Sequence, residues 1–230
     1  MRDPRRIRRM FAALAPRYNL LNHLLSGCLD RMWRRSLIAA LDLSDGARAL
    51  DVCAGTAHLA AECLRRHPNL GAMVVSDFVP EMLALAPVWL RRDERVAFVA
   101  ADALHLPFPD AAFDASFNAF GLRNTADPAT AVVEMVRVVK PGGAVGILEF
   151  FQPPEGWWRT PAGLWTRHAV PLLGRLISPH PEAYAYLPQS MNDFLSVDAC
   201  AQLLADAGCE ATHQRRLTGG VATAVVARKR

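Results

Sequence analysis

From residue 47 onward, short apolar segments alternate with amphipathic ones, and this alternation constrains the fold more than any other feature of the chain. Parallel strands need long connections, which are usually helices, so the pattern predicts a doubly wound α/β sheet. Strands are expected over 47–53, 72–76, 95–100, 112–119 and 144–149, and helices over 58–66, 80–90, 128–138 and 197–207. Two more strands are expected around Gly219-Gly220, one of them antiparallel to the rest.

Two segments depart from this alternation, and both are expected to belong to one domain spanning residues 1–230. Residues 10–43 carry leucines at helical spacing and predict an N-terminal helical cap (1–43), broken into two helices at Ser26-Gly27. Residues 152–190 are rich in Pro, Trp, Tyr and His and predict short helices inserted over the sheet.

Composition narrows the classes of protein that remain. No apolar run approaches the length of a membrane-spanning helix, and the five cysteines include no C-x-x-C, which favours a cytoplasmic protein without a disulfide framework. The formal net charge is +4, but the arginines of residues 1–9 and the basic residues 228–230 account for it. The sequence between these two ends is therefore mildly acidic. A nucleic-acid-binding face is therefore not expected. The basic start either contacts anionic lipid at the inner face of the membrane or is simply solvated.

The most informative local unit is the strand–turn–helix at residues 51–60. A dinucleotide-binding loop reads G-x-G-x-x-G, whereas Gly55 is the only glycine here, and the carboxylate of Asp51 stands inside the strand beside the turn. A carboxylate would repel a pyrophosphate. The turn therefore favours a ligand that carries an amine and no phosphates.

Two more carboxylates follow at the ends of successive strands. Asp77 stands where a carboxylate can accept both hydroxyls of a ribose, and Asp102 is placed to meet an adenine edge. Each alone is more often a cap or turn residue. Together with Asp51, they indicate an adenosine with a positively charged amino-acid tail, which is S-adenosylmethionine.

At this point the whole chain resembles the ubiquinone/menaquinone biosynthesis C-methyltransferases, a family of class I S-adenosylmethionine-dependent enzymes. The matching pieces are Ala15-Pro16-Arg17-Tyr18-Asn19, Leu50-Asp51-Val52-Cys53-Ala54-Gly55-Thr56, Leu106-Pro107-Phe108-Pro109-Asp110, Phe120-Gly121-Leu122-Arg123-Asn124, Lys140-Pro141-Gly142-Gly143 and Tyr184-Ala185-Tyr186-Leu187-Pro188-Gln189-Ser190. The fourth and last pieces are the most specific to the family.

The resemblance implies C-methylation of a polyprenylated quinol. A phenol titrates near pH 10, so a fixed cation beside its oxygen is needed to favour the reactive phenolate. Arg123 is the candidate cation, with Asn124 on the second oxygen and Tyr18 or a water completing the proton relay. The competing interpretation of Arg123 is a surface salt bridge with Asp127 or Glu134. The residues implied to bind the cofactor are Asp51, Gly55, Thr56, Asp77, Phe78, Asp102, Ala103 and Asn118. The N-terminal helices and the insert are implied to cover the site.

Several positions depart from the family pattern. Ala57 stands where the family usually has glycine, and His58 stands where it has an acid. If residue 57 needs a positive φ, alanine is strained there. These departures leave two alternatives open: a methyltransferase for a soluble phenolic metabolite, and a cofactor-binding partner subunit without catalysis. Which quinone is methylated, and whether the chain forms a homodimer, also stay open. The histidines show no paired metal-ligand spacing, so no metal is expected.

Overall fold

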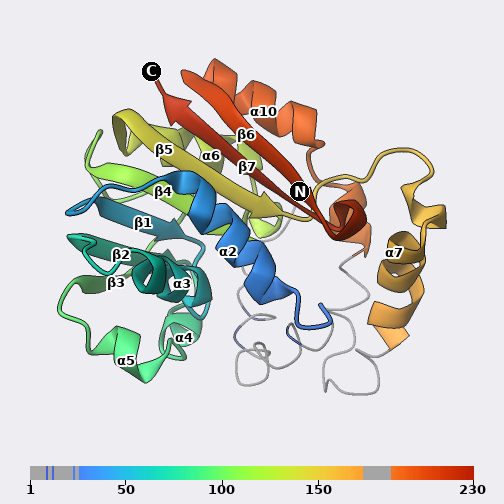
Figure 1. The fold of residues 1–230 in the computed structure, drawn as a ribbon, viewed down its shortest axis with the longest axis horizontal. Helices are drawn as coiled ribbons and strands as arrows, with labels where there is room; N and C mark the ends of the chain where they lie inside the picture. The colour runs from blue at the N-terminus through green and yellow to red at the C-terminus, as the bar shows by residue number, and fades with distance from the viewer. Residues whose placement is uncertain (1–8, 10–11, 13–22, 24–25, 173–187) are drawn as a thin grey trace.

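A seven-stranded sheet forms the centre of the molecule (Figure 1). The computed structural model describes residues 9, 12, 23, 26–172 and 188–230, and the backbone alone at 211–212. The strands lie in the order β3 (Val96–Ala100), β2 (Ala72–Asp77), β1 (Arg48–Val52), β4 (Phe113–Ala119), β5 (Val139–Glu149), β7 (Ala222–Lys229) and β6 (Cys209–Leu217). The first five are parallel, and β7 is antiparallel to both of its neighbours. The predicted sheet, mostly parallel with one antiparallel C-terminal strand, is confirmed.

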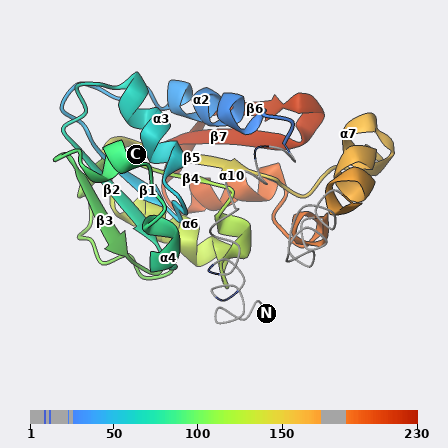
Figure 2. The same ribbon diagram turned by 90° about the horizontal axis from the view of Figure 1, so that it is seen from below.

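Helices cover both faces of the sheet, as a doubly wound fold requires. Figure 2 shows α2 (Asp30–Leu41) and α3 (His58–Arg66) on one face and α6 (Pro128–Arg137) and α10 (Val197–Asp206) on the other. Two separate hydrophobic clusters of buried side chains correspond to these two faces. The N-termini of α6 and α10 are capped by the side chains of Asp127 and Ser196, which accept hydrogen bonds from backbone N–H groups of the first turn.

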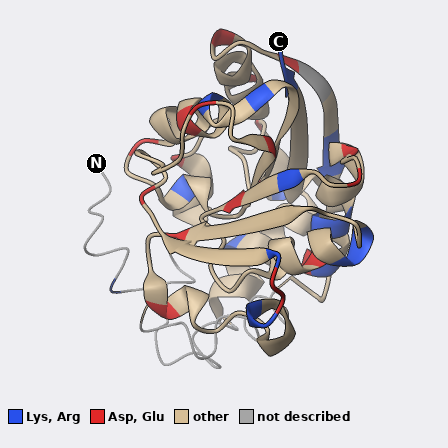
Figure 3. Ribbon diagram, turned by 90° about the vertical axis from the view of Figure 1, so that its left-hand side faces the viewer, with Lys and Arg blue, Asp and Glu red and all other residues tan. Residues whose placement is uncertain are grey.

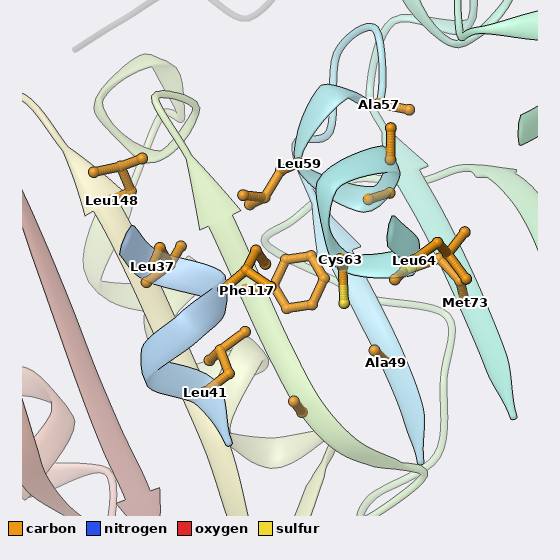
Figure 4. Packing of buried hydrophobic residues seen from close by; sticks show 14 of the residues in the cluster. Leu37, Leu41, Ala49, Ala57, Leu59, Cys63, Leu64, Met73, Phe117 and Leu148 are labelled. Carbon is orange, nitrogen blue, oxygen red and sulfur yellow. The ribbon is translucent and has the colours of Figure 1, made fainter. Parts of the chain in front are cut away.

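Phe117 of β4 lies at the centre of the first cluster. Its ring is fully buried, and Figure 4 shows Leu37 and Leu41 of α2 on one side of it and Leu59 and Cys63 of α3 on the other. Because α2 and α3 both pack onto this strand, the N-terminal helix is part of the main core. The N-terminal end of α2 is thereby fixed beside the carboxyl ends of the strands.

Two predicted boundaries are wrong. The helix expected over 80–90 is broken into α4 (Pro80–Leu83) and α5 (Val88–Arg91), because Pro87 takes an extended conformation with ψ of 135° between them. The strand expected from residue 144 already begins at Val139. The Lys140-Pro141-Gly142-Gly143 segment forms an irregularity within β5, with Gly142 at φ +78°, and the register against β4 shifts there.

The two unusual segments are described in part. The break predicted at Ser26-Gly27 is confirmed by the turn over residues 26–29. In the insert, η2 (Trp157–Arg159), α7 (Pro161–Leu164) and η3 (Trp165–Ala169) follow one another, and Trp157 Nε1 donates to the carbonyl oxygen of Gly219 at 2.9 Å. This anchors the insert to η4 (Thr218–Gly220), between β6 and β7. Residues 173–187, which the prediction of a covering insert also concerns, lie outside the described residues. No described helix is long and apolar enough to cross a membrane.

Candidate active site

A cleft opens at the carboxyl ends of β1, β2 and β4, on either side of the point where the strand order reverses between β1 and β4. Ligands of open α/β sheets bind at such a point. The empty volume of the cleft is about 1030 Å³ including its open mouth, enough for a ligand of drug size. Its lining includes Arg34, Asp51, Gly55, Thr56, His58, Asp77, Phe78, Asp102, Ala103, Phe120, Gly121 and Asn124.

Asp51 is a fully buried carboxylate in the wall of this cleft. The backbone N–H of Ala60 donates to Asp51 Oδ2 at 2.9 Å, whereas Oδ1 has no hydrogen-bond partner among the described residues. Burial raises the pKa of Asp51 to about 8, and the positive charge of Arg34 opposes that rise. An unpartnered buried carboxylate oxygen is a ready acceptor for a ligand ammonium group.

The turn after β1 is held by a second carboxylate. Asp77, at the end of β2, accepts hydrogen bonds from the backbone N–H of Gly55 at 2.7 Å and of Val79 at 2.8 Å. Each carboxylate oxygen has further acceptor capacity, so Asp77 can shape the turn and still face a ligand. Burial raises the pKa of Asp77 as well. Gly55 has φ of +56°.

The residue after this turn has a positive φ, the conformation in which alanine is strained. Ala57 is fully buried at the N-cap of α3 with φ of +60° and ψ of 27°, in the left-handed region. Beside it, Thr56 Oγ1 and His58 Nδ1 lie 3.0 Å apart in hydrogen-bond contact. Burial lowers the pKa of His58, and the charge of Arg34 lowers it further. The imidazole in the cleft is therefore neutral at pH 7.

The structure also brings the other predicted cofactor residues to the cleft, with one exception. Phe78 is 41% exposed and follows Asp77 directly, while Asp102 is exposed and accepts a hydrogen bond from the backbone N–H of Leu104. Ala103 is buried in the lining. Asn118 is the exception, because it is fully buried and does not line the cleft.

Asn118 instead ties the turn after β4 to β1. Its Nδ2 donates to the carbonyl oxygen of Val52 at 2.6 Å, and its Oδ1 accepts from the backbone N–H of Gly121 and of Leu122. A Cβ at Gly121 would lie 2.5 Å from that of Cys53, so the close approach of the two turns requires glycine. The turns that carry the cofactor residues and the Arg123 motif are thus joined.

Arg123 lies in η1 (Leu122–Asn124), immediately behind this turn. Its guanidinium donates to Glu149 Oε1 at 2.8 Å and to the carbonyl oxygen of Phe120 at 2.7 Å, and it stacks over the ring of Phe150. The ion pair is buried, with 11% of the Arg123 side chain and none of the Glu149 side chain exposed. Nε of Arg123 is buried with no hydrogen-bond partner among the described residues.

The alternative salt bridges of Arg123 are not formed. Asp127 caps α6, and Glu134 pairs with Arg137. Asn124 lines the cleft beside Arg123, with its Nδ2 donating to the Phe120 carbonyl and its Oδ1 buried without a partner in the described chain. Arg123 itself is not among the lining residues. Tyr18 lies outside the described residues.

Two charged residues of the site were assigned no role from the sequence. Glu149 stands at the end of β5, so the strand-end rule that selected Asp77 and Asp102 could have found it. Arg34 reaches the cleft from α2, where it pairs with Asp30, and the sequence marked it only as part of Trp33-Arg34-Arg35, a further piece of the family resemblance. Elsewhere, basic and acidic positions are interspersed over the described elements (Figure 3). In the described parts of the chain, no group of His, Cys, Asp and Glu could hold a metal ion.

The fold resembles that of solved S-adenosylmethionine-dependent methyltransferases. The enzyme of that kind from Aquifex aeolicus superposes with a TM-score of 0.60 over 84% of this chain and 88% of its own, at 19% sequence identity. At this identity the likeness establishes the fold. The particular family follows from the sequence comparisons.

The sequence profile of the ubiE/COQ5 methyltransferase family matches residues 1–229, and the chain belongs to that family. A demethylmenaquinone methyltransferase of Deinococcus radiodurans is 42% identical over 225 residues, which cover 97% of this chain and 92% of that protein. The ubiquinone/menaquinone biosynthesis C-methyltransferase UbiE of Geobacter sulfurreducens is 39% identical over 226 residues, covering 95% and 86%. The chain is thus a methyltransferase, and S-adenosylmethionine is its methyl donor.

The cleft fits that donor. S-adenosylmethionine carries an ammonium group, and the unpartnered Oδ1 of buried Asp51 offers it an acceptor. The single-glycine turn offers no cradle of amide groups for a pyrophosphate, in agreement with a ligand that has none.

Proposed function

We propose that this methyltransferase methylates a ring carbon of a polyprenylated quinol in quinone biosynthesis. The names of the relatives support this acceptor class. The observation that carries it is that η1, beside the cofactor cleft, holds two polar atoms with no partner in the described part of the chain, the Nε–H donor of Arg123 and the Oδ1 acceptor of Asn124. A hydroquinone ring presents two oxygens that require such groups, one of which becomes negatively charged.

The cofactor supplies an electrophilic methyl group on a sulfonium. We propose that Asp51 holds its ammonium group, that Asp77 accepts from its ribose hydroxyls, and that Phe78, Asp102 and Ala103 bound its adenine. Gly55 and Thr56 shape the turn beneath its methionine portion, while Asn118 positions that turn through Val52.

Arg123 would lower the cost of ionising the quinol. A guanidinium stays protonated at all physiological pH values, so it stabilises the phenolate rather than accepting its proton. Glu149 and the Phe120 carbonyl hold one nitrogen of the guanidinium and leave Nε–H free to donate to the oxyanion. Asn124 Oδ1 accepts from the second hydroxyl. The hydroxyl proton would leave to a water or to Tyr18. The ring carbon would then take the methyl group as the methyl–sulfur bond breaks and the thioether product departs, and it would lose its own hydrogen as a second proton to solvent, which restores the aromatic ring.

The test replaces Arg123 by lysine, which keeps the positive charge but loses the planar guanidinium and its rigidly placed N–H donors. Loss of one oxyanion donor costs roughly a hundredfold to a thousandfold in kcat, and we expect a loss of that order with a reduced demethylated quinol as acceptor. Affinity for S-adenosylmethionine should change little, because Arg123 does not line the cofactor cleft. The matched control is Arg35→Lys on α2, whose side chain is 67% exposed. Unchanged kcat in Arg123→Lys would refute the assigned role.

We further propose that the arginines of residues 1–9 bring the protein to the anionic cytoplasmic face of the membrane, where a polyprenylated acceptor resides. Each basic residue near such a surface contributes about 1 kcal/mol. Co-sedimentation with vesicles containing anionic lipid should decrease when these arginines are replaced by glutamine, and equal binding to neutral vesicles would contradict the idea. A homodimer stays a prediction, which sedimentation velocity can test.

A further inference from the structure

A buried cation lies in the same cleft as Asp51, and the cofactor residues predicted from the sequence do not include it. Arg34 of α2 lines the cleft, and only 14% of its side chain is exposed. Its guanidinium carbon lies 5.6 Å from the centroid of the ring of Phe120, and Phe120 also lines the cleft. A guanidinium in so enclosed a place must be compensated by nearby negative charge.

Part of that compensation comes from α2 itself. Arg34 NH1 donates to Asp30 Oδ2, while His23 Nδ1 lies 2.8 Å from Asp30 Oδ1, so Asp30 is fixed from both sides. Asp30 is the only hydrogen-bond partner of the Arg34 side chain in the described chain, and a guanidinium has five N–H donors. Donors of Arg34 therefore stay available to a ligand.

Arg34 and Asp51 act on one another through charge but form no ion pair together. Both residues line the same cleft, and the charge of Arg34 opposes the burial-driven rise of the Asp51 pKa. Yet Asp51 Oδ1 has no hydrogen-bond partner within the described ranges, and Arg34 pairs with Asp30. The cleft is therefore lined by one acidic and one basic side chain, both with unused hydrogen-bonding capacity toward the described residues.

This arrangement complements an α-amino acid, which carries an ammonium and a carboxylate on the same carbon. His58, which also lines the cleft and whose pKa burial and Arg34 both lower, is neutral at pH 7 and repels neither charge. We propose that Arg34 binds the carboxylate of the methionine portion of S-adenosylmethionine while Asp51 holds the ammonium, with Asp30 and His23 positioning Arg34. The inference rests on the proposed function only in taking S-adenosylmethionine as the ligand.

The test compares two ligands that differ only in that carboxylate, S-adenosylmethionine and its decarboxylated form, by calorimetric titration. The wild-type protein should prefer the intact ligand about tenfold to hundredfold, the usual effect of a hydrogen bond to a charged group. In Arg34→Gln, which can still donate to Asp30, the preference should fall to about threefold or less. Arg35→Gln, the neighbouring exposed arginine, should keep the wild-type preference.

The outcomes separate this inference from the proposed function. If Arg34→Gln keeps the full preference for the intact ligand, the inference is overturned while the methyl donor stands. The same holds if Arg34→Gln alters only KM for the quinol. If the wild-type protein binds neither ligand, both proposals fail. Should Arg34→Gln not fold, Arg34→Lys would replace it, because lysine keeps the charge and the Asp30 pair but loses the planar guanidinium. The preference of Arg34→Lys for the intact ligand should fall by a smaller factor. No fall would again overturn the inference.

Discussion

Ala57 is a buried non-glycine residue in the left-handed region, at the N-cap of α3. A non-glycine residue in the left-handed region costs roughly 1–2 kcal/mol. Replacing a buried alanine by glycine normally costs about 2 kcal/mol, half from chain entropy and half from the lost methyl group. Because the two effects offset each other, Ala57→Gly should change the free energy of unfolding by less than about 1 kcal/mol.

The matched control for this substitution is Ala61→Gly, four residues further along α3 and equally buried but helical. Urea unfolding should show that Ala61→Gly loses about 2 kcal/mol. A similar loss in Ala57→Gly would mean that the left-handed conformation of Ala57 carries no strain.

Asp51 predicts a pH dependence of cofactor binding. Its pKa of about 8 means that the carboxyl is mostly protonated at pH 7 in the free protein, whereas an ammonium ligand needs it ionised. Binding then releases a proton, and the affinity for S-adenosylmethionine should rise by up to about tenfold per pH unit between about pH 6 and pH 7.5. Calorimetric titration across that range measures the slope.

The groups that act on Asp51 set the sign of this effect. Burial raises its pKa, Asp77 adds to the rise, and Arg34 and the Ala60 N–H oppose it. Because the folded-state pKa lies above the unfolded value, the contribution of Asp51 to stability falls as the pH rises from about 4 to about 8. Affinity that is flat with pH, or that keeps its slope in Asp51→Asn, would contradict the assignment.

Much of the site at this scale could be predicted from the sequence, because strand-end carboxylates follow from strand positions alone. Asp51, Asp77 and Asp102 all reach the cleft as expected. Arg34 could not be predicted in this way, since its distance in sequence from β1 gives no sign that α2 delivers it to the same cleft. The partner of Arg123 was also missed, because pairing across η1 and β5 depends on tertiary packing.

At the scale of elements, one side chain links the end of β7 to the connection between α6 and β5. Lys229 Nζ, at the end of β7, donates to the carbonyl oxygens of Val136 at 3.0 Å, Arg137 at 3.2 Å and Val139 at 2.8 Å. The carbonyls of Val136 and Arg137 lie at the C-terminal end of α6, where a positive charge is favourable, and that of Val139 lies at the start of β5. Lys229→Met keeps the aliphatic stem and should lower the free energy of unfolding by about 1–2 kcal/mol.

The control is Arg230→Met, which removes a positive charge one residue further on, where the side chain is exposed. Chemical denaturation should leave the stability of Arg230→Met within about 0.5 kcal/mol of the unsubstituted chain. If both variants lose the same stability, net charge rather than the capping of α6 is responsible.

The predicted element boundaries are wrong at two places where the local sequence pattern did not decide the structure. The apolar spacing over 80–90 is helical throughout, but Pro87 has no backbone N–H and restrains the residue before it. In β5 the opposite happened, because Lys-Pro-Gly-Gly is typical of a turn yet is held in the sheet as an irregularity by pairing with β4. Tertiary pairing of this kind is not encoded in local sequence preference.

At the scale of the whole molecule, the order of strands decides where the chemistry occurs. The sheet reverses direction of winding between β1 and β4, and the turns after these two strands meet through Asn118, Val52 and Gly121. One turn carries Gly55 and Thr56, which we propose for the cofactor, and the other carries Arg123 and Asn124, which we propose for the acceptor. The fold would then hold methyl donor and acceptor on neighbouring turns of one sheet, which is the arrangement that a transfer reaction needs.

The measurement that tests this account most directly is the fate of an isotope-labelled methyl group. The protein would be incubated with labelled S-adenosylmethionine and, separately, with reduced demethylated naphthoquinol and benzoquinol acceptors that carry a prenyl chain. We predict label on a ring carbon of at least one product, identified by mass spectrometry and NMR, and its loss in Arg123→Lys. Label on an oxygen, or no transfer by a protein that binds S-adenosylmethionine, would contradict the account.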